Sequence, residues 1–173
     1  MQISVGDLAG VSTSTVCRVL HLVSGVIAMC ARDDVMLPAS REERAATMLD
    51  FHALAGFPGV LGAIDCTHIP IQSPGGVNSE LYRNRKGYFS LNVQGVVNSH
   101  LLFENVVARW QGSSHDANIF ANSRLCARLE SGEIGNAYLL GDSGYPCKPY
   151  LLTPLGVALT EAESLNNFRQ TRK

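Results

Sequence analysis

The sequence predicts an α/β fold with a small helical region in front of it, and three observations lead to this prediction. Residues 1–30 carry apolar side chains at three- to four-residue spacing, which indicates helices. From residue 56 onward the order of signals becomes strand, hairpin, helix, strand. The two apolar strands that open and close this series end at Asp65 and Asp142. We therefore divide the chain into a helix-turn-helix with linking helices (1–50) and a sheet domain (51–173).

The composition is that of an ordinary globular protein. The chain has 173 residues, of which 46% are hydrophobic, enough for a sizeable core. A net charge of −1 argues against a uniformly basic surface but is compatible with a local basic patch. The five cysteines are scattered without a C-x-x-C pair, so we expect neither disulfides nor a zinc cluster. The apolar stretches fall short of a bilayer span and no secretory signal is present, so we expect no membrane partner and a cytosolic or nuclear location.

The first 30 residues predict a helix-turn-helix. In "DLAGVSTSTVCRVL", Gly10 and Val11 form the turn, and Ser12 is suited to cap a second amphipathic helix. In bacterial repressors the second helix of such a pair enters the major groove, and Arg18 would then contact DNA. A helical hairpin that only packs predicts the same pattern, with Arg18 as an ordinary exposed residue.

A linking helix and a buried strand follow. Pro38 ends one element, and Ser40 with Glu43 forms a capping box that opens a new helix. After a turn, residues 60–64 are apolar and mostly β-forming, as in a strand that is buried on both faces.

A hairpin, a crossing helix and a second buried strand complete the predicted elements. Residues 91–97 alternate in character, Asn98 and Ser99 form a turn, and "LLFENVVARW" continues extended. The segment "GSSHDANIFANSRLCARLESG" predicts one helix that stops at Gly132. The run "AYLLGDSGYP" predicts the last strand.

The two strand-end carboxylates predict a cation site. Asp65 and Asp142 are 142 − 65 = 77 positions apart. If their strands are neighbours in one sheet, the carboxylates meet at one edge, where a cation between them removes the cost of two like charges. Mg²⁺ or Mn²⁺ prefers oxygen ligands and can activate water for phosphodiester cleavage. Alternatively, each aspartate only caps a turn.

Four ordered segments resemble a known family. The segments "AGFPGVLGAIDCTHIPI", "YRNRKGYFSLNVQGVVNS", "VVARWQGSSHDANIFANS" and "YLLGDSGYPCKPYLLTPL" resemble the endonuclease domain of Harbinger-type transposases and of the domesticated nucleases derived from them. The match covers most of residues 51–173. The resemblance implies a ribonuclease H-like mixed sheet flanked by helices, a Mg²⁺ or Mn²⁺ centre, DNA as the substrate, a nuclear location and a separate Myb-like DNA-binding partner.

The resemblance also implies roles for single residues. Asp65 would be the first acidic metal ligand and Asp142 the second. The third acid of the family is a glutamate on a helix after an Asn-aromatic-Arg stretch, and "NNFRQTRK" is similar to the entry to that helix but reaches no glutamate. Glu161 and Glu163 come too early for this role. We therefore expect impaired cleavage, or alternatively a catalytically inactive, domesticated module that binds DNA or a protein.

Other polar residues in these segments have two interpretations each. His68 would reach the second shell of the metal or a phosphate, or it is a strand-end histidine satisfied by the backbone. His115 and Asp116 would border the site, or Asp116 serves the start of a helix. Ser143 would bond a ligand carboxylate, or only fills a turn. The resemblance further implies that three basic residues hold the DNA backbone: Arg83, Arg85 and Lys86.

Two further functions have less support. An aspartyl-phosphate phosphatase built on "IDCTH" needs a second aspartate two residues after the first, where Thr67 stands. A bacterial-type repressor accounts for the first 30 residues but leaves both strand-end carboxylates unexplained.

Overall fold

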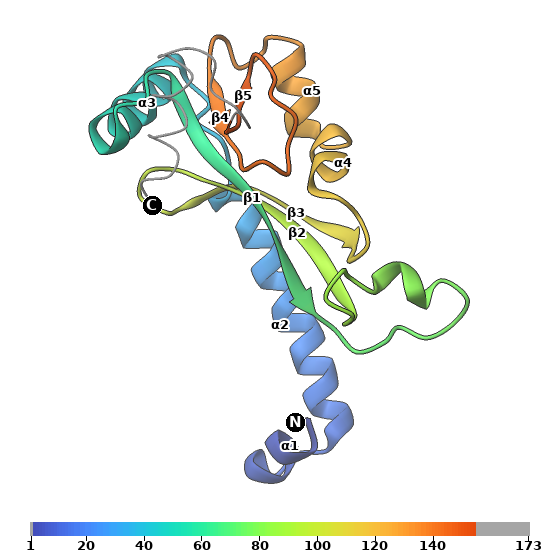
Figure 1. Cartoon of the computed structure of the whole chain (residues 1–173). Coiled ribbons are helices and arrows are strands. Elements are labelled where there is room, and N and C mark those ends of the chain that lie inside the picture. The colour runs from blue at the N-terminus through green and yellow to red at the C-terminus, as the bar shows by residue number, and fades with distance from the viewer. Residues whose placement is uncertain (1, 155–173) are drawn as a thin grey trace. The chain divides into compact units, whose positions relative to one another are not determined.

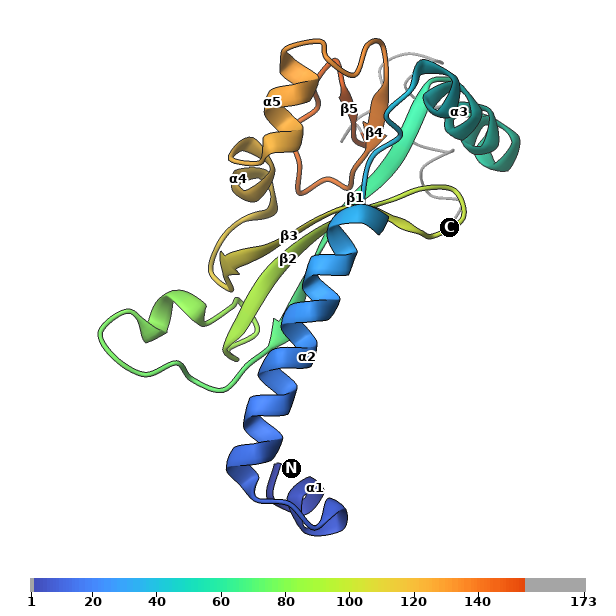
Figure 2. The same ribbon diagram turned by 180° about the vertical axis from the view of Figure 1, so that it is seen from behind.

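The computed structural model describes residues 2–154, which fall into two compact units. The first is Met1–Met36, and the second begins at Leu37. Figures 1 and 2 show the helices and strands of both units from opposite sides. Each unit is described by itself below.

The first unit is a pair of helices joined by a tight turn. Helix α1 (Gln2–Ala9) and helix α2 (Thr13–Asp34) are separated by Gly10, whose φ of +65° lies in the left-handed region that favours glycine. The side chain of Ser12 accepts a hydrogen bond from the Thr15 backbone N–H (3.2 Å), which confirms its predicted capping role. The DNA-binding role of Arg18, which is exposed on α2, stays a prediction.

Helix α2 carries a long apolar surface. Val16 is buried, whereas Val19, Leu20, Val23 and Ile27 are exposed. With 22 residues and a mean hydropathy of 1.6, α2 is long and apolar enough to cross a membrane. The expectation that every apolar stretch falls well short of a bilayer span is therefore wrong for α2. Length and composition alone do not separate a membrane span from a helix that another protein segment covers.

Helix α3 (Arg41–Ala55) belongs to the second unit, where it packs against strand β1 (Val60–Pro70). The predicted capping box is present, because Ser40 accepts from the Glu43 N–H and the Glu43 carboxylate accepts from the Ser40 N–H. Phe51 on α3 and Phe57 after it form a buried cluster with Val60. The residue 50/51 boundary drawn from the sequence thus falls inside a helix that packs on the sheet.

The sheet is mixed and has five strands in the order β3-β2-β1-β4-β5. Strands β2 (Ser90–Val97) and β3 (Phe103–Gln111) form the predicted antiparallel hairpin, and β2 pairs antiparallel with β1. On the other side of β1, strands β4 (Tyr138–Leu140) and β5 (Leu151–Leu152) run parallel to it. A 3₁₀ turn, η1 (Ser79–Tyr82), lies between β1 and β2. The predicted mixed sheet flanked by helices is confirmed and is consistent with a ribonuclease H-like fold.

Two short helices, rather than the one predicted, connect β3 to β4. These are α4 (Asp116–Ala121) and α5 (Arg124–Glu130). The chain breaks between them because the Ser123 side chain accepts a hydrogen bond from the Cys126 N–H and so starts a new helix. Phe120 of α4 and the buried apolar residues of α5 belong to one core cluster with residues of the central strands. Its most buried members are Leu61, Ile64, Val96, Phe120, Leu125, Ala137, Leu139 and Leu151.

One buried carboxylate gives the sheet a predicted pH dependence. Glu104 on β3 is 6% exposed, and its Oε2 has no hydrogen-bond partner within residues 2–154. Burial raises the pKa of this carboxyl, partly offset by a hydrogen bond with Asn98. Compared with the unfolded chain, the folded protein therefore binds this proton more tightly, and burial destabilises the ionised form. The free energy of unfolding therefore has its full value below the pKa of Glu104 in the unfolded chain. It decreases as the pH rises through the raised pKa of the folded protein.

Glu104→Gln is therefore expected to raise the free energy of unfolding at pH 7 by about 1 kcal/mol, because it removes a poorly compensated buried charge. Urea unfolding at pH values from 4 to 8 would measure this, and the dependence on pH should become flatter in the variant. Glu42→Gln, on the exposed start of α3, is the matched control and should change little. A variant that is less stable than the wild type at pH 7 would contradict the prediction.

Candidate active site

Strand β1 carries Asp65 in its middle, not at its end as the sequence predicted. The strand continues to Pro70 because it pairs with β2 along residues 63–70. Its first half is mostly buried, and from Asp65 onward exposed and partly buried residues alternate. What stops near Asp65 is the apolar, doubly covered part of the strand. Figure 1 shows β1 running well past the short strands β4 and β5.

The register between β1 and β4 brings Asp65 and Asp142 to the same level of the sheet. The last parallel pair is Ala63 with Leu140, and each aspartate follows its member of that pair by two residues. The chain stays beside β1 after β4 ends, since a Cβ built on Gly141 would lie 3.4 Å from Ile64 Cγ2. Both carboxylates are therefore placed where β1 loses its β4 neighbour.

Each of these carboxylates is held by a backbone N–H through one oxygen only. Asp65 Oδ1 accepts from the Cys66 N–H (2.7 Å), and Asp142 Oδ1 accepts from the Gly144 N–H (2.9 Å). Both side chains are exposed, and the second oxygen of each accepts no hydrogen bond from the residues that the structure describes. These second oxygens are free to bind a ligand.

A third carboxylate, Asp116 at the start of α4, lies close to Asp142. Its Oδ1 accepts from Asn92 Nδ2 (2.9 Å), which also donates to the Ser114 carbonyl (2.9 Å). A Cβ built on Gly144 would lie 2.9 Å from Asp142 Oδ1 and 3.6 Å from Asp116 Oδ2. Gly144 thus leaves a space between the two carboxylates that any larger residue would fill. Asp116 starts its helix and also borders this space, so the two sequence interpretations are compatible.

Two neutral groups lie beside the carboxylates. The Cys66 thiol and the Tyr145 hydroxyl are hydrogen-bonded (3.2 Å). Burial raises the pKa of Cys66 to about 12, and the negative charges of Asp116 and Asp65 add to this increase. Burial also raises the pKa of Tyr145, with contributions from the same two carboxylates. Neither group ionises near neutral pH, so the charge of the site comes from its aspartates.

Strand β2 turns a row of polar side chains toward the covered side of the sheet. Ser90, Asn92 and Gln94 are all fully buried. The row anchors its neighbours, since Asn92 holds Asp116, while Ser90 Oγ is hydrogen-bonded to His68 Nδ1 (3.0 Å) and accepts from Asn84 Nδ2 (3.0 Å). His68 therefore has a partner of its own. Alternation along β1 also points it to the opposite face from Asp65.

The burial of this row was difficult to predict from the sequence. Asn92 and Gln94 alternate with Leu91 and Val93, a pattern that usually indicates polar side chains facing water. The signal that could have found them is the pair of amides at i and i+2, which share one face of the strand.

The remaining predicted site residues differ in how they are engaged. His115 caps α4 without a side-chain hydrogen bond, and Ser143 is exposed after Asp142. Arg83 is already occupied, with two hydrogen bonds to the Glu80 carboxylate (2.7 and 3.1 Å) and one to the Gly87 carbonyl (2.8 Å). Its guanidinium also lies 4.4 Å from the centre of the Phe89 ring. Arg83 thus stabilises its own loop.

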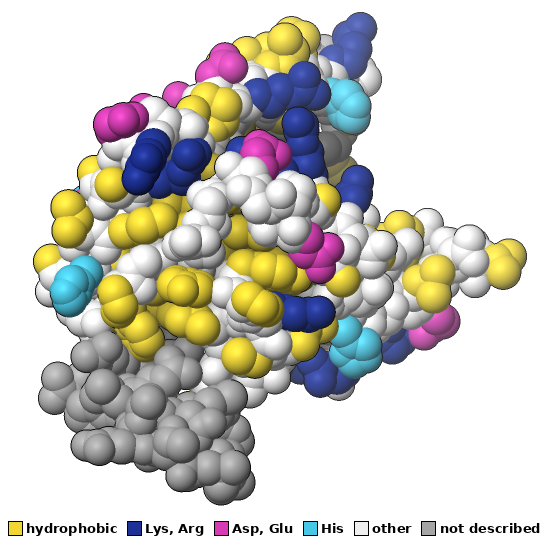
Figure 3. Space-filling view, turned by 90° about the horizontal axis from the view of Figure 1, so that it is seen from above, with side chains coloured by type: hydrophobic (Ala, Val, Ile, Leu, Met, Phe, Trp, Pro, Cys, Tyr) yellow, Lys and Arg dark blue, Asp and Glu magenta, His cyan; other side chains and the backbone are white. Residues whose placement is uncertain are grey.

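Arg85 and Lys86 are the exposed basic residues of that loop, and their side chains form no ion pair with the residues that the structure describes. Figure 3 shows Lys and Arg side chains interspersed with Asp and Glu on the face it displays, rather than a continuous basic surface. Any contact of this face with an anion would therefore be local.

Within residues 2–154, no group of three or more His, Cys, Asp or Glu side chains could hold a metal ion. The described carboxylates therefore do not make a complete three-acid site. Glu161, Glu163 and the segment "NNFRQTRK" lie outside the described residues.

Comparison with known proteins decides the family. A model of the DDE superfamily endonuclease family matches residues 64–172, more than half of the chain. The chain belongs to the DDE superfamily endonucleases. The match begins in β1 just before Asp65 and includes Asp116 and Asp142.

Several curated proteins are similar to this DDE endonuclease chain. The human candidate nuclease HARBI1 is 33% identical over 167 residues, covering 96% of this chain and 48% of the relative. HARBI1 of Rattus norvegicus is 34% identical, covering 94% and 46%. Protein ALP1-like of Arabidopsis thaliana is 29% identical, covering 87% and 40%. The chain thus spans about half the length or less of these relatives. No solved structure gives a significant match. The predicted resemblance to Harbinger-derived nucleases is confirmed.

Proposed function

We propose that this chain carries part of the active site of a divalent-metal-dependent enzyme that hydrolyses DNA phosphodiester bonds, with Asp65 and Asp142 as two of its metal ligands. The register of β1 with β4 is the observation that carries the proposal, because it places both aspartates at one level of the sheet. Membership of a nuclease family supports the reaction class. The metal and the DNA substrate are our inference.

The residues present fit a hard divalent cation. Carboxylate oxygens are the ligands that Mg²⁺ and Mn²⁺ prefer, and Asp65 and Asp142 each offer one oxygen with no hydrogen bond from the described residues. Gly144 keeps the space beside Asp142 free of a side chain. When bound, the cation would supply charge neutralisation and activation of water.

The chain's own groups orient this site. The N–H groups of Cys66 and Gly144 fix the two ligand carboxylates in place through their Oδ1 atoms. Asn92 does the same for Asp116, whose Oδ2 faces the space at Gly144 and could accept a proton from a nearby water. The neutral Cys66 and Tyr145 add no charge of their own.

We further propose that metal binding and cleavage by this polypeptide are weak. The described residues contain no group of three ligands that could hold the cation, so water would complete its coordination. Because the proposed substrate is DNA, we also propose a nuclear location.

Nicking of supercoiled plasmid DNA in the presence of Mn²⁺ tests the function. We expect slow nicking by the wild type, none in excess EDTA, and at least tenfold slower nicking by Asp65→Ala and Asp142→Ala. Asp33→Ala, which removes an exposed carboxylate of α2, is the matched control and should behave as the wild type. Nicking that persists in both site variants or in EDTA would refute the proposed centre.

The second candidate function is a module that binds DNA or another protein without cleaving DNA. The exposed apolar face of α2 favours this candidate. One relative, 29% identical over 88% of this chain, is named Antagonist of Like Heterochromatin Protein 1. That name refers to another protein and not to a reaction. A chain that binds DNA or a Myb-like protein but never nicks plasmid with Mn²⁺ would favour this candidate.

A further inference from the structure

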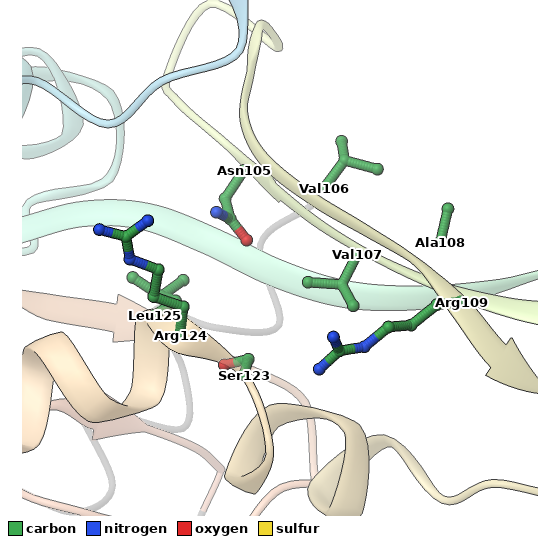
Figure 4. Close-up of a pocket in the computed structure, with 8 residues that line it drawn as sticks. All are labelled: Asn105, Val106, Val107, Ala108, Arg109, Ser123, Arg124 and Leu125. Carbon is green, nitrogen blue, oxygen red and sulfur yellow. The ribbon is translucent and has the colours of Figure 1, made fainter. Parts of the chain in front are cut away.

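A pocket of about 410 Å³ lies between β3 and the start of α5, in the second unit. Figure 4 shows Asn105, Val107 and Arg109 pointing from β3 toward α5, while Val106 and Ala108 point away. From the other side the pocket is closed by the residues that begin α5. These are Ser123, Arg124 and Leu125.

The polar groups of this pocket are mainly hydrogen-bond donors. Its lining contains two arginines and no carboxylate. Arg109 uses one N–H on the Asn122 carbonyl (3.3 Å), and neither Arg109 nor Arg124 forms an ion pair with the residues that the structure describes. Both guanidinium groups therefore keep donors for a ligand. Ser123 Oγ accepts from the Cys126 N–H, so its hydroxyl hydrogen is free to donate as well.

The Asn105 side chain adds a second, independent sign of a ligand. Its Oδ1 is buried and has no hydrogen-bond partner among the described residues. The two ends of an amide are assigned from the surrounding hydrogen bonds. With the amide reversed, Nδ2 takes this position and donates into the pocket, which removes the unsatisfied acceptor when an anion is present.

We propose that this pocket binds a backbone phosphate of DNA, and this proposal rests on the nuclease function proposed above. A phosphate accepts hydrogen bonds from several directions, and this pocket has donors on both β3 and α5. Arginine binds phosphate through two parallel N–H groups. The net charge of the chain is −1 and its surface carries charges of both signs, so the attraction of this pocket for a phosphate would be local. Neither Asp65 nor Asp142 lines it, so it would serve binding of the substrate and not the reaction itself.

Fluorescence anisotropy with a labelled 20-base-pair duplex in EDTA tests the pocket without the metal. The double variant Arg109→Gln/Arg124→Gln should bind the duplex about tenfold more weakly than the wild type. The slope of log K against log salt should become about 0.9 units shallower, because one phosphate contact is lost and each contributes about 0.9. Arg32→Gln/Arg41→Gln removes the same charge from two exposed positions and should leave the slope nearly unchanged.

A second variant separates binding from folding. Arg109→Lys/Arg124→Lys keeps the charge but loses the planar donors, so it should retain the salt slope while losing part of the affinity. An unchanged slope in the glutamine variant would overturn the proposal. So would an equal loss of affinity for polyglutamate, which would assign the pocket to acidic peptides. If the wild type never nicks DNA but the slope changes as described, the proposed reaction fails and the phosphate pocket stands.

Discussion

Asp142→Ala is expected to reduce the affinity for Mn²⁺ more than tenfold, and Asp65→Ala should do the same. The two carboxylates follow the last β1–β4 pair by two residues each, so a shared cation would lose half of its described protein ligands in either variant. Isothermal titration calorimetry with Mn²⁺ measures the loss. The double variant should lose less binding free energy than the sum of the two single losses, because residues that share one ligand are not additive.

Gly144→Ala tests the same site without removing a ligand. The added Cβ would lie 2.9 Å from Asp142 Oδ1, so the Asp142 carboxylate must shift. We expect weaker Mn²⁺ binding with an unchanged free energy of unfolding. Asp33→Ala again serves as the control. Wild-type affinity in both Asp65→Ala and Asp142→Ala would show that the cation does not lie between these residues.

Leu139→Ala is expected to lower the free energy of unfolding by about 3 kcal/mol. Leu139 is fully buried in β4, between β1 and β5, and belongs to the main core cluster. Truncation removes apolar contacts and leaves a cavity that flanking strands cannot easily close. Urea unfolding, followed by far-ultraviolet circular dichroism, gives the difference.

Leu140→Ala is the matched control for this loss. Leu140 is the next residue of β4, but it is only partly buried, against the cluster of Phe51, Phe57 and Val60. Its truncation should cost about 1 kcal/mol. Equal losses in the two variants would contradict the placement of Leu139 in the centre of the core.

Local signals in the sequence predicted most of the elements. Ser12 and Ser40 were predicted as helix caps from their own short-range context, and both cap helices in the structure. The β2–β3 hairpin followed from alternation and the turn at Asn98. These features depend on neighbours a few residues away, which is why a sequence alone can reveal them.

Long-range pairing decided the features that the sequence misplaced. The end of the apolar run predicts that the strand ends at Asp65. Pairing with β2 instead extends β1 by five residues, to Pro70. The alternation along residues 91–97 did not show which face is covered, and Asn92 is buried on the covered face, where it holds Asp116. The Ser123 cap divided the crossing helix in two. Such effects depend on partners far along the chain.

The 77 positions between Asp65 and Asp142 have a consequence for folding as well as for chemistry. Neighbouring strands bring the two aspartates to one level of the folded sheet, whereas an unfolded chain holds them far apart on average. A cation bound between them would therefore bind the native state and not the unfolded chain. At a free concentration of one hundred times its Kd, it would add about 2.7 kcal/mol to the stability of the fold.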